Sequence, residues 1–323
     1  MRNASLSRRR VLGAALAAVA PIAFGQEAGF PDRPIRFIVG YAAGGGVDTM
    51  ARILAQRLSA VLGQSVIVEN RGGVAGMIAA DAVARSPADG YTLLYGESAL
   101  LIAPQLQKTQ IDPLKAFAPV AGAFQSRLMI VANNKVPASN PKELIALLKD
   151  NPGRYSYGTS GVGTVHHLGF ELMKARADVS ITHIPYRGAS QIIPNVINGE
   201  LAIGVVSAAT AIPQARSGRL KAIASMSTTM PGAEDVPLVS EVLPGFDVAP
   251  RQMLLAPAGT PAQVVERLSA AVRTVLARPE LAQSAAQQGV TPAYMAPDAL
   301  ARDLERESSD WSRVIKAQKI KAE

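Results

Sequence analysis

Two glycine-rich turns constrain the fold of this chain more than any other feature of its sequence. Each follows an apolar segment and opens an amphipathic one, and they lie in different halves of the chain, at residues 44–46 and 160–164. Such a turn between a strand and a helix directs backbone N–H groups and the helix N-terminus at one point, as anion sites do. The fold must therefore accommodate two strand-turn-helix units of this kind, one in each half of the chain.

Strands and helices alternate around both turns. The patterns predict strands at residues 35–41, 65–70, 91–96, 154–159, 181–188, 201–207 and 220–226, a strand from about 251, and helices at 48–62, 75–85, 164–176 and 297–316. Asn140, Pro141 and Glu143 predict a capped helix start, and Thr260 to Gln263 predict a second capping box. Alternating elements imply parallel sheets with helices on both faces. We therefore expect an α/β fold of two doubly wound domains facing each other across a ligand cleft.

The composition is that of a packed globular protein and does not indicate nucleic-acid binding. Hydrophobic residues make up 48% of the 323 residues, and charged residues make up 18%. Of the formal charge of +8, four units come from arginines in the first 25 residues, which contain no acid; basic and acidic residues are interspersed elsewhere. We find no basic block with interleaved aromatic residues, so nucleic acid is not an expected partner.

The N-terminus has the pattern of a secretory signal. Arg8, Arg9 and Arg10 precede a short, Ala-rich apolar run, and Ala23-Phe24-Gly25 has the small-x-small pattern of a cleavage site. The run is too short for a membrane span and contains Pro21. We expect residues 1–25 to be a twin-arginine-like signal peptide cleaved after Gly25, with a periplasmic mature protein; export by the general secretory route stays open.

Motifs for catalysis or metal binding are missing from the sequence. The chain has no cysteine, no H-E-x-x-H and no P-loop, and the glycines at 44–46 do not fit G-x-G-x-x-G. Val162 stands where a nucleophile elbow around Ser160 needs glycine, and Ser98 fails in the same way. We expect no cofactor, no metal and no catalytic residue, although a serine with a histidine stays open as a convergent arrangement.

The second turn is suited to binding a carboxylate. Ser160, Gly161, Val162, Gly163 and Thr164 offer N–H groups and two hydroxyls within one short loop. The alternative is that the glycines only permit a tight turn. Two such loops, one in each half of an exported chain, favour ligand capture.

The chain resembles the Bordetella uptake gene (Bug) family, the periplasmic solute-binding receptors of tripartite tricarboxylate transporters. The resemblance covers almost the whole chain after residue 30, and it is carried by PDRPIRFIVGYAAGGGVDTMARILAQRL, GQSVIVENRGGVAG, SPADGYTLLYG, SYGTSGVGTVHHLGFELMK, HIPYRGASQIIPNVINGEL and LLAPAGTP. It implies a Venus-flytrap protein with residues 26–124 and 248–323 in the first domain and residues 125–247 in the second. It also implies a monomer that delivers a small carboxylate to membrane permease subunits, or that reports to a sensor kinase.

The same resemblance implies a set of ligand-binding positions. They comprise the first turn, the turn after the third strand, the second turn and two single positions near the crossovers: Tyr41, Ala42, Ala43, Gly44, Gly45, Glu97, Ser98, Ser160, Gly161, Val162, Gly163, Thr164, Ser207 and Arg251. Ala42-Ala43 replaces a usual proline pair, Ser207 replaces a frequent aspartate, and Arg251-Gln252-Met253 replaces Trp-Phe-Gly.

Two charged residues, Arg251 and Glu97, leave the chemical class of the ligand undecided. Our hypothesis is that Arg251 pairs with a second acidic group of the ligand, and the alternative is a solvated arginine. Glu97 in the pocket would instead favour an amine or a hydroxyl; it can also pair with Arg251 or face solvent. The competing function is an exported α/β hydrolase that uses Ser160 or Ser98 with a histidine on an acidic substrate.

Overall fold

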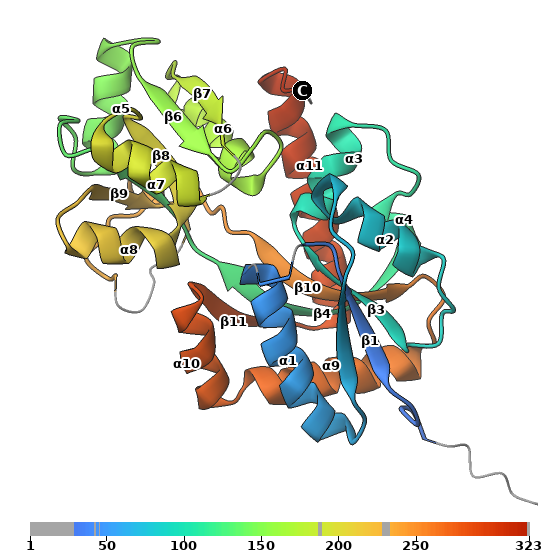
Figure 1. Cartoon of the computed structure of the whole chain (residues 1–323). Helices are drawn as coiled ribbons and strands as arrows, with labels where there is room; N and C mark the ends of the chain where they lie inside the picture. Colours follow the sequence, from blue (N-terminus) through green and yellow to red (C-terminus); the bar gives the residue numbers. More distant parts are fainter. Residues whose placement is uncertain (1–28, 42, 45, 187–188, 228–232, 322–323) are drawn as a thin grey trace, which may run out of the picture.

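The computed structural model describes residues 29–41, 43–44, 46–186, 189–227 and 233–321, and two β-sheets dominate it (Figure 1). The first sheet has the strand order β11-β4-β10-β3-β1-β2, with β1 Ile35–Val39, β2 Val66–Asn70, β3 Thr92–Glu97, β4 Phe117–Ser126, β10 Arg251–Pro257 and β11 Val290–Met295. The second sheet has the order β7-β6-β8-β5-β9, with β5 Leu128–Ala132, β6 Ser156–Thr159, β7 Thr182–Pro185, β8 Ile203–Ser207 and β9 Lys221–Ser225. The predicted two-domain α/β fold class is therefore confirmed.

Helices cover both sheets. They are α1 Gly46–Leu62, α2 Met77–Ala84, α3 Ala99–Leu106, α4 Pro113–Ala116, α5 Pro141–Asp150, α6 Val165–Ala177, α7 Ala189–Asn198, α8 Ala208–Arg216, α9 Ala262–Leu276, α10 Pro279–Gln287 and α11 Pro297–Ala317, with short 3-10 turns at Val74–Gly76 and Val239–Glu241. In α1, Met50, Leu54 and Leu58 are buried one helical turn apart, which explains how this helix docks on the first sheet. Among the helices of the described residues, none has the length and apolarity that crossing a membrane requires.

Both sheets are mixed, whereas the sequence pattern predicted parallel ones. Strands β1, β2 and β3 are parallel, but β10 is antiparallel to β3 and β4, and β5 is antiparallel to β8 and β9. The reason is that the chain enters each sheet from the other one. A strand entering through the edge at which parallel strands end must run opposite to them, as β5 and β10 do.

Two local predictions were wrong. Thr260 does not cap α9, because its hydroxyl donates a hydrogen bond to the carbonyl of Pro257, and Pro261 occupies the N-cap. The helix predicted from residue 75 begins at Met77, because Val74 and Ala75 have positive φ. The predicted cap at Asn140 is confirmed: its side chain accepts from the Glu143 N–H at 2.9 Å, and the Glu143 carboxylate accepts from the Ser139 N–H.

The chain passes between the sheets twice. The first crossing lies between Ser126 of β4 and Leu128 of β5, and the second connects β9 to β10. Helix α11 contacts both α3 and α6 (Figure 1), and Leu101, Leu168 and Trp311 belong to one apolar cluster that joins the two halves. The domain boundaries at residues 125 and 248 stay predictions, and the predicted signal peptide lies outside the described residues.

Candidate carboxylate-binding site

The predicted ligand-binding positions that the structure describes follow the ends of strands at the two sheet edges that face each other, or begin β10 there. Strands β1 and β3 of the first sheet end there, followed by Tyr41 and by the turn at Glu97 and Ser98. Strands β6 and β8 of the second sheet end at the opposing edge, followed by residues 160–164 and the start of α8. We refer to these as the facing edges.

Close contacts at two glycines connect the two halves of the molecule. A Cβ placed on Gly163 would lie 2.4 Å from Leu106 Cδ1 of α3, so the second glycine turn lies directly against the first half of the molecule. A Cβ placed on Gly289 would lie 2.3 Å from the Cβ of Ala209 in α8. These two contacts join the half that carries the second glycine turn and α8 to the half that carries α3 and β11.

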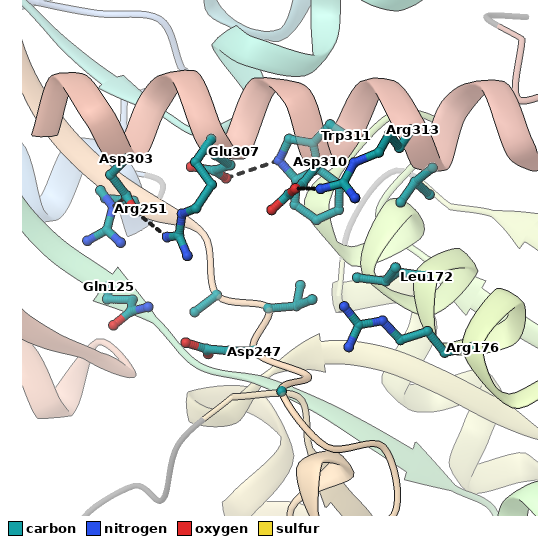
Figure 2. A pocket seen from close by; sticks show the side chains of 15 residues that line it. Gln125, Leu172, Arg176, Asp247, Arg251, Asp303, Glu307, Asp310, Trp311 and Arg313 are labelled. Atoms are coloured by element: carbon teal, nitrogen blue, oxygen red, sulfur yellow. Dashed lines mark hydrogen bonds and ion pairs between the residues drawn. The ribbon is translucent and has the colours of Figure 1, made fainter.

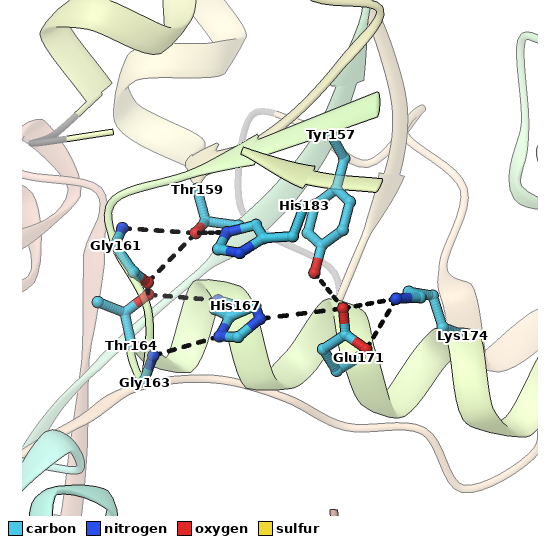
Figure 3. Close-up of polar contacts among 9 residues, drawn as sticks. All are labelled: Tyr157, Thr159, Gly161, Gly163, Thr164, His167, Glu171, Lys174 and His183. Carbon is cyan, nitrogen blue, oxygen red and sulfur yellow. Dashed lines mark hydrogen bonds and ion pairs between the residues drawn. The ribbon is translucent and has the colours of Figure 1, made fainter. Parts of the chain in front are cut away.

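The second glycine turn, residues 160–164, is held by its own hydrogen bonds (Figure 3). The Thr164 hydroxyl donates to the Gly161 carbonyl at 2.8 Å and accepts the His167 N–H, which caps α6. The Gly163 N–H donates to His167 Nδ1 at 3.2 Å, and the Gly161 N–H donates to Thr159 Oγ1. The Thr164 hydroxyl and the two glycine N–H groups are therefore already used within the loop.

Other donors of this turn remain available. In the part of the chain that the structure describes, no hydrogen bond is donated by the N–H groups of Ser160, Val162, Val165 or His166. Val165 and His166 form the first turn of α6, where no carbonyl of the helix can accept from them. Their positive helix end supports a negative charge at this edge.

A buried polar cluster supports the turn from behind (Figure 3). Thr159 Oγ1 lies 2.7 Å from His183 Nε2, and the His183 ring stacks on the His167 ring with centroids 3.9 Å apart. Glu171 accepts from the Tyr157 hydroxyl at 2.5 Å and from Lys174 at 2.7 Å. This network fixes the backbone of the turn.

The histidines of this region are neutral near pH 7. Burial lowers the pKa of His166 to about 4. Burial, reinforced by the positive charge of Lys174, lowers the pKa of His167 to about 4, and burial followed by the nearby His167 does the same for His183. Within the described residues, no hydrogen bond joins a histidine to Ser98 or Ser160, and no three potential metal ligands cluster.

The first glycine turn is organised by Asp48, which the sequence reasoning missed. The buried Asp48 carboxylate accepts from the Gly44 N–H at 2.8 Å, from Arg52 and from Asn70. Burial raises the pKa of Asp48, but these hydrogen bonds outweigh it and leave the pKa lowered. The Gly44 N–H is thus engaged. Ala43 is exposed, and Ala42 and Gly45 lie outside the described residues.

Tyr41 and Glu97 lie together at the end of this edge. The Tyr41 hydroxyl is buried and lacks a hydrogen bond of good geometry, although it lies close enough to Glu97 for each to shift the other's pKa. Burial raises the pKa of Glu97; the Tyr41 hydroxyl lowers it in part, and Glu307 raises it further. Glu97 is half-buried and forms no ion pair with Arg251.

Ser98 and Arg251 serve the packing of α11. Ser98 is fully buried, and its Oγ accepts the Arg251 N–H at 2.9 Å. The Arg251 guanidinium donates to Asp303 of α11 at 2.8 Å, and its side chain is only 11% exposed. It lines a cavity of about 380 Å³ between α11, α6 and the second crossing segment, shown in Figure 2. Arg251 is therefore neither solvated nor paired with Glu97, and a protein carboxylate already occupies it.

The sequence reasoning also missed Arg127, which lies beside Ser207. Ser207 Oγ is 3.2 Å from the hydroxyl of Thr210, and the next residue, Ala208, donates its N–H to the Arg127 carbonyl. Arg127 directly precedes β5, at the first crossing between the sheets. A single arginine between two apolar strands is the signal that could have identified it.

The chain is similar to known receptors over most of its length. Residues 50–320 match the model of the tripartite tricarboxylate transporter family receptor. BugT of Bordetella pertussis is 33% identical, over 89% of this chain and 90% of its own. The solved structure of the periplasmic binding protein BugD has 30% identity and a TM-score of 0.74, over 91% of this chain and 100% of its own.

Two solved structures of Rhodopseudomonas palustris proteins contain carboxylates. One, with adipate, has 29% identity and a TM-score of 0.77, covering 90% of this chain and 99% of its own. The other, MatC with bound malate, has 28% identity and a TM-score of 0.72, covering 88% of this chain and 100% of its own.

Proposed function

Since this chain belongs to the tripartite tricarboxylate transporter receptor family, we propose that it captures a small carboxylate between its facing edges and delivers it to permease subunits. Solute binding is the function of the family and of its solved members. Adipate and malate in two related structures support a small organic acid as the ligand here.

The observation that carries this proposal is the second glycine turn with its available donors. We propose that the N–H groups of Ser160, Val162, Val165 and His166, together with the Ser160 hydroxyl, hold one carboxylate at the N-terminus of α6. Tyr41, Ala43, Glu97 and Ser207 would contact the ligand from neighbouring positions. Because the Gly44 N–H is engaged by Asp48, the first turn contributes less than its three glycines suggest.

Binding without catalysis is the function that the histidines favour. His167 and His183 form hydrogen bonds with groups other than the two candidate serines, and the pKa of all three histidines is about 4, so they are weak bases at neutral pH. We therefore propose that no residue of this site is catalytic, against the hydrolase alternative.

The location and assembly complete the proposal. The solved relative BugD is a periplasmic binding protein, which supports a periplasmic location for this chain. We propose cleavage after Gly25, a monomeric mature protein and docking of its ligand-bound form on permease subunits. Signalling to a sensor kinase is the variant. The N-terminal sequence of the periplasmic protein, its mass in solution and co-purification with the permease would test these points.

Mass spectrometry of small molecules released by denaturing the gently purified protein tests the central proposal. A stoichiometric carboxylic acid is the expected result. An empty protein would be followed by thermal denaturation with a panel of mono- and dicarboxylates, since a bound ligand raises the melting temperature. The proposal fails if the protein is empty and no carboxylate stabilises it.

A further inference from the structure

Resting on the proposed function, we propose that Arg127 is the residue that binds a second acidic group of the ligand. It would thereby select dicarboxylates over monocarboxylates. The sequence assigned this role to Arg251, but Asp303 already occupies that guanidinium. Arg127 lies at the first crossing between the sheets, and Arg251 lies at the end of the second. Arg251 already has a protein carboxylate as its partner, whereas we expect Arg127 to take its carboxylate from the ligand.

The position of Arg127 places it on the edge that carries the proposed carboxylate site. In the pairing of β5 with β8, Leu128 lies opposite Ser207, so Arg127 lies just beyond the end of β8. Strand β6, which leads into the second glycine turn, is parallel to β8 and pairs with it. The Arg127 guanidinium extends along this edge towards the end of β9, with Nη1 3.5 Å from the Ser227 hydroxyl.

The guanidinium of Arg127 lacks the partner that such a group normally has. Its Nε is buried without a hydrogen bond, and no carboxylate of the described residues lies within ion-pair distance of it. Burial lowers the pKa of Arg127, and the more distant Asp247 offsets only part of this. By contrast, Arg36 forms a two-pronged pair with Glu69 at 2.8 Å.

A ligand carboxylate would supply what Arg127 lacks. A guanidinium offers parallel N–H donors that match both oxygens of a carboxylate, and a partly buried charge without a partner is costly. One carboxylate on the second glycine turn and another on Arg127 would span the edge from the start of α6, after β6, past β8 and β5 towards the end of β9. A monocarboxylate held on the second glycine turn would leave Arg127 without a carboxylate partner.

The test compares matched acids on the full mature protein by calorimetry. The probes are adipate against hexanoate, and malate against 3-hydroxybutyrate, in which a methyl group replaces one carboxylate; succinate and glutarate with their monocarboxylates extend the set. Arg127→Gln is expected to weaken dicarboxylate binding about 10- to 100-fold and to leave monocarboxylate binding within about twofold. Arg127→Lys keeps the charge without the fork, so a smaller loss is expected. Arg219→Gln, an exposed arginine in the same half, is the control.

The ratio of dicarboxylate to monocarboxylate affinity is the decisive quantity, because a general loss of folding would weaken both classes equally. An unchanged ratio in Arg127→Gln overturns the inference about Arg127 but leaves the proposed function standing. A wild-type protein that prefers monocarboxylates has the same consequence. A wild-type protein that binds no carboxylate of the set contradicts the proposed function, and the inference then falls with it.

Discussion

Asp303 lies on the buried side of α11 and connects two arginines, the buried Arg251 and the exposed Arg306. Its carboxylate accepts from Arg251 at the start of β10 and from Arg306 one turn along the helix. Only 7% of the Asp303 side chain is exposed. This carboxylate therefore compensates a charge on the second crossing segment, where the two halves of the molecule meet.

Removing that charge should destabilise the protein strongly. For Asp303→Asn we expect the free energy of unfolding to fall by about 3 kcal/mol, because Arg251 stays buried without a counter-charge. Urea denaturation measures this. Asp310→Asn is the matched control on the same helix, since Asp310 pairs with Arg313 in an exposed position and should contribute at most about 1 kcal/mol. Equal losses in the two variants would contradict this account.

At the scale of elements, sequence patterns predicted most strands and helices but not all of their ends. The Asn140 cap was predictable because its partners are three residues away, within one turn. The role of Asp48 was not predictable. Its carboxylate accepts the Gly44 N–H, which a ligand would otherwise use, and this contact depends on how α1 packs beside β1 and β2. Arg127 was missed for a related reason: its importance comes from strand pairing, which brings it beside Ser207. Hydrophobic periodicity predicts helices and strands, but it does not predict which distant segments contact each other.

Two helix caps allow stability to be separated from binding. Thr164→Val and Asn140→Ala each remove a side-chain acceptor at a helix N-terminus, and each should cost about 1 kcal/mol of unfolding free energy. Only Thr164 also holds the Gly161 carbonyl in the second glycine turn, so only Thr164→Val should weaken carboxylate affinity. Calorimetric titration of both variants checks this, and comparable affinity losses would show that the turn is not the site.

At the scale of the whole molecule, stability should decrease as the solution is acidified from pH 7. The pKa of His167 is about 4 in the folded protein and about 6.5 when unfolded. Between these two pKa values the unfolded chain binds more protons than the folded protein. The free energy of unfolding therefore decreases as the pH is lowered, by up to roughly 3 kcal/mol for this group. Melting temperatures across this window measure the effect. His167→Gln should flatten the curve, and an equally steep curve would assign the loss to other groups.

The contact between Gly289 and α8 should control how closely the two halves approach. Gly289→Ala places a methyl group 2.3 Å from the Ala209 Cβ, whereas Gly259→Ala, also at positive φ, meets nothing within 4 Å. Both substitutions carry backbone strain of about 1 kcal/mol. Only Gly289→Ala should separate the facing edges, which would enlarge the radius of gyration with ligand present and weaken binding. X-ray scattering of both variants distinguishes the outcomes, and identical profiles would exclude a role for this contact.

The double crossing also determines the order in which the protein can assemble. All strands of the second sheet lie in one continuous stretch, Leu128 to Ser225, so this sheet can form as soon as that stretch is available. The first sheet cannot, because its interior strand β10 comes after the whole second sheet; the bond from the Tyr95 hydroxyl to Gln252 joins residues 157 positions apart. Pairings this distant in sequence form slowly. Until β10 arrives, β1, β2 and β3 have an unpaired edge at β3, so the incompletely folded chain exposes strand hydrogen-bonding groups that favour aggregation.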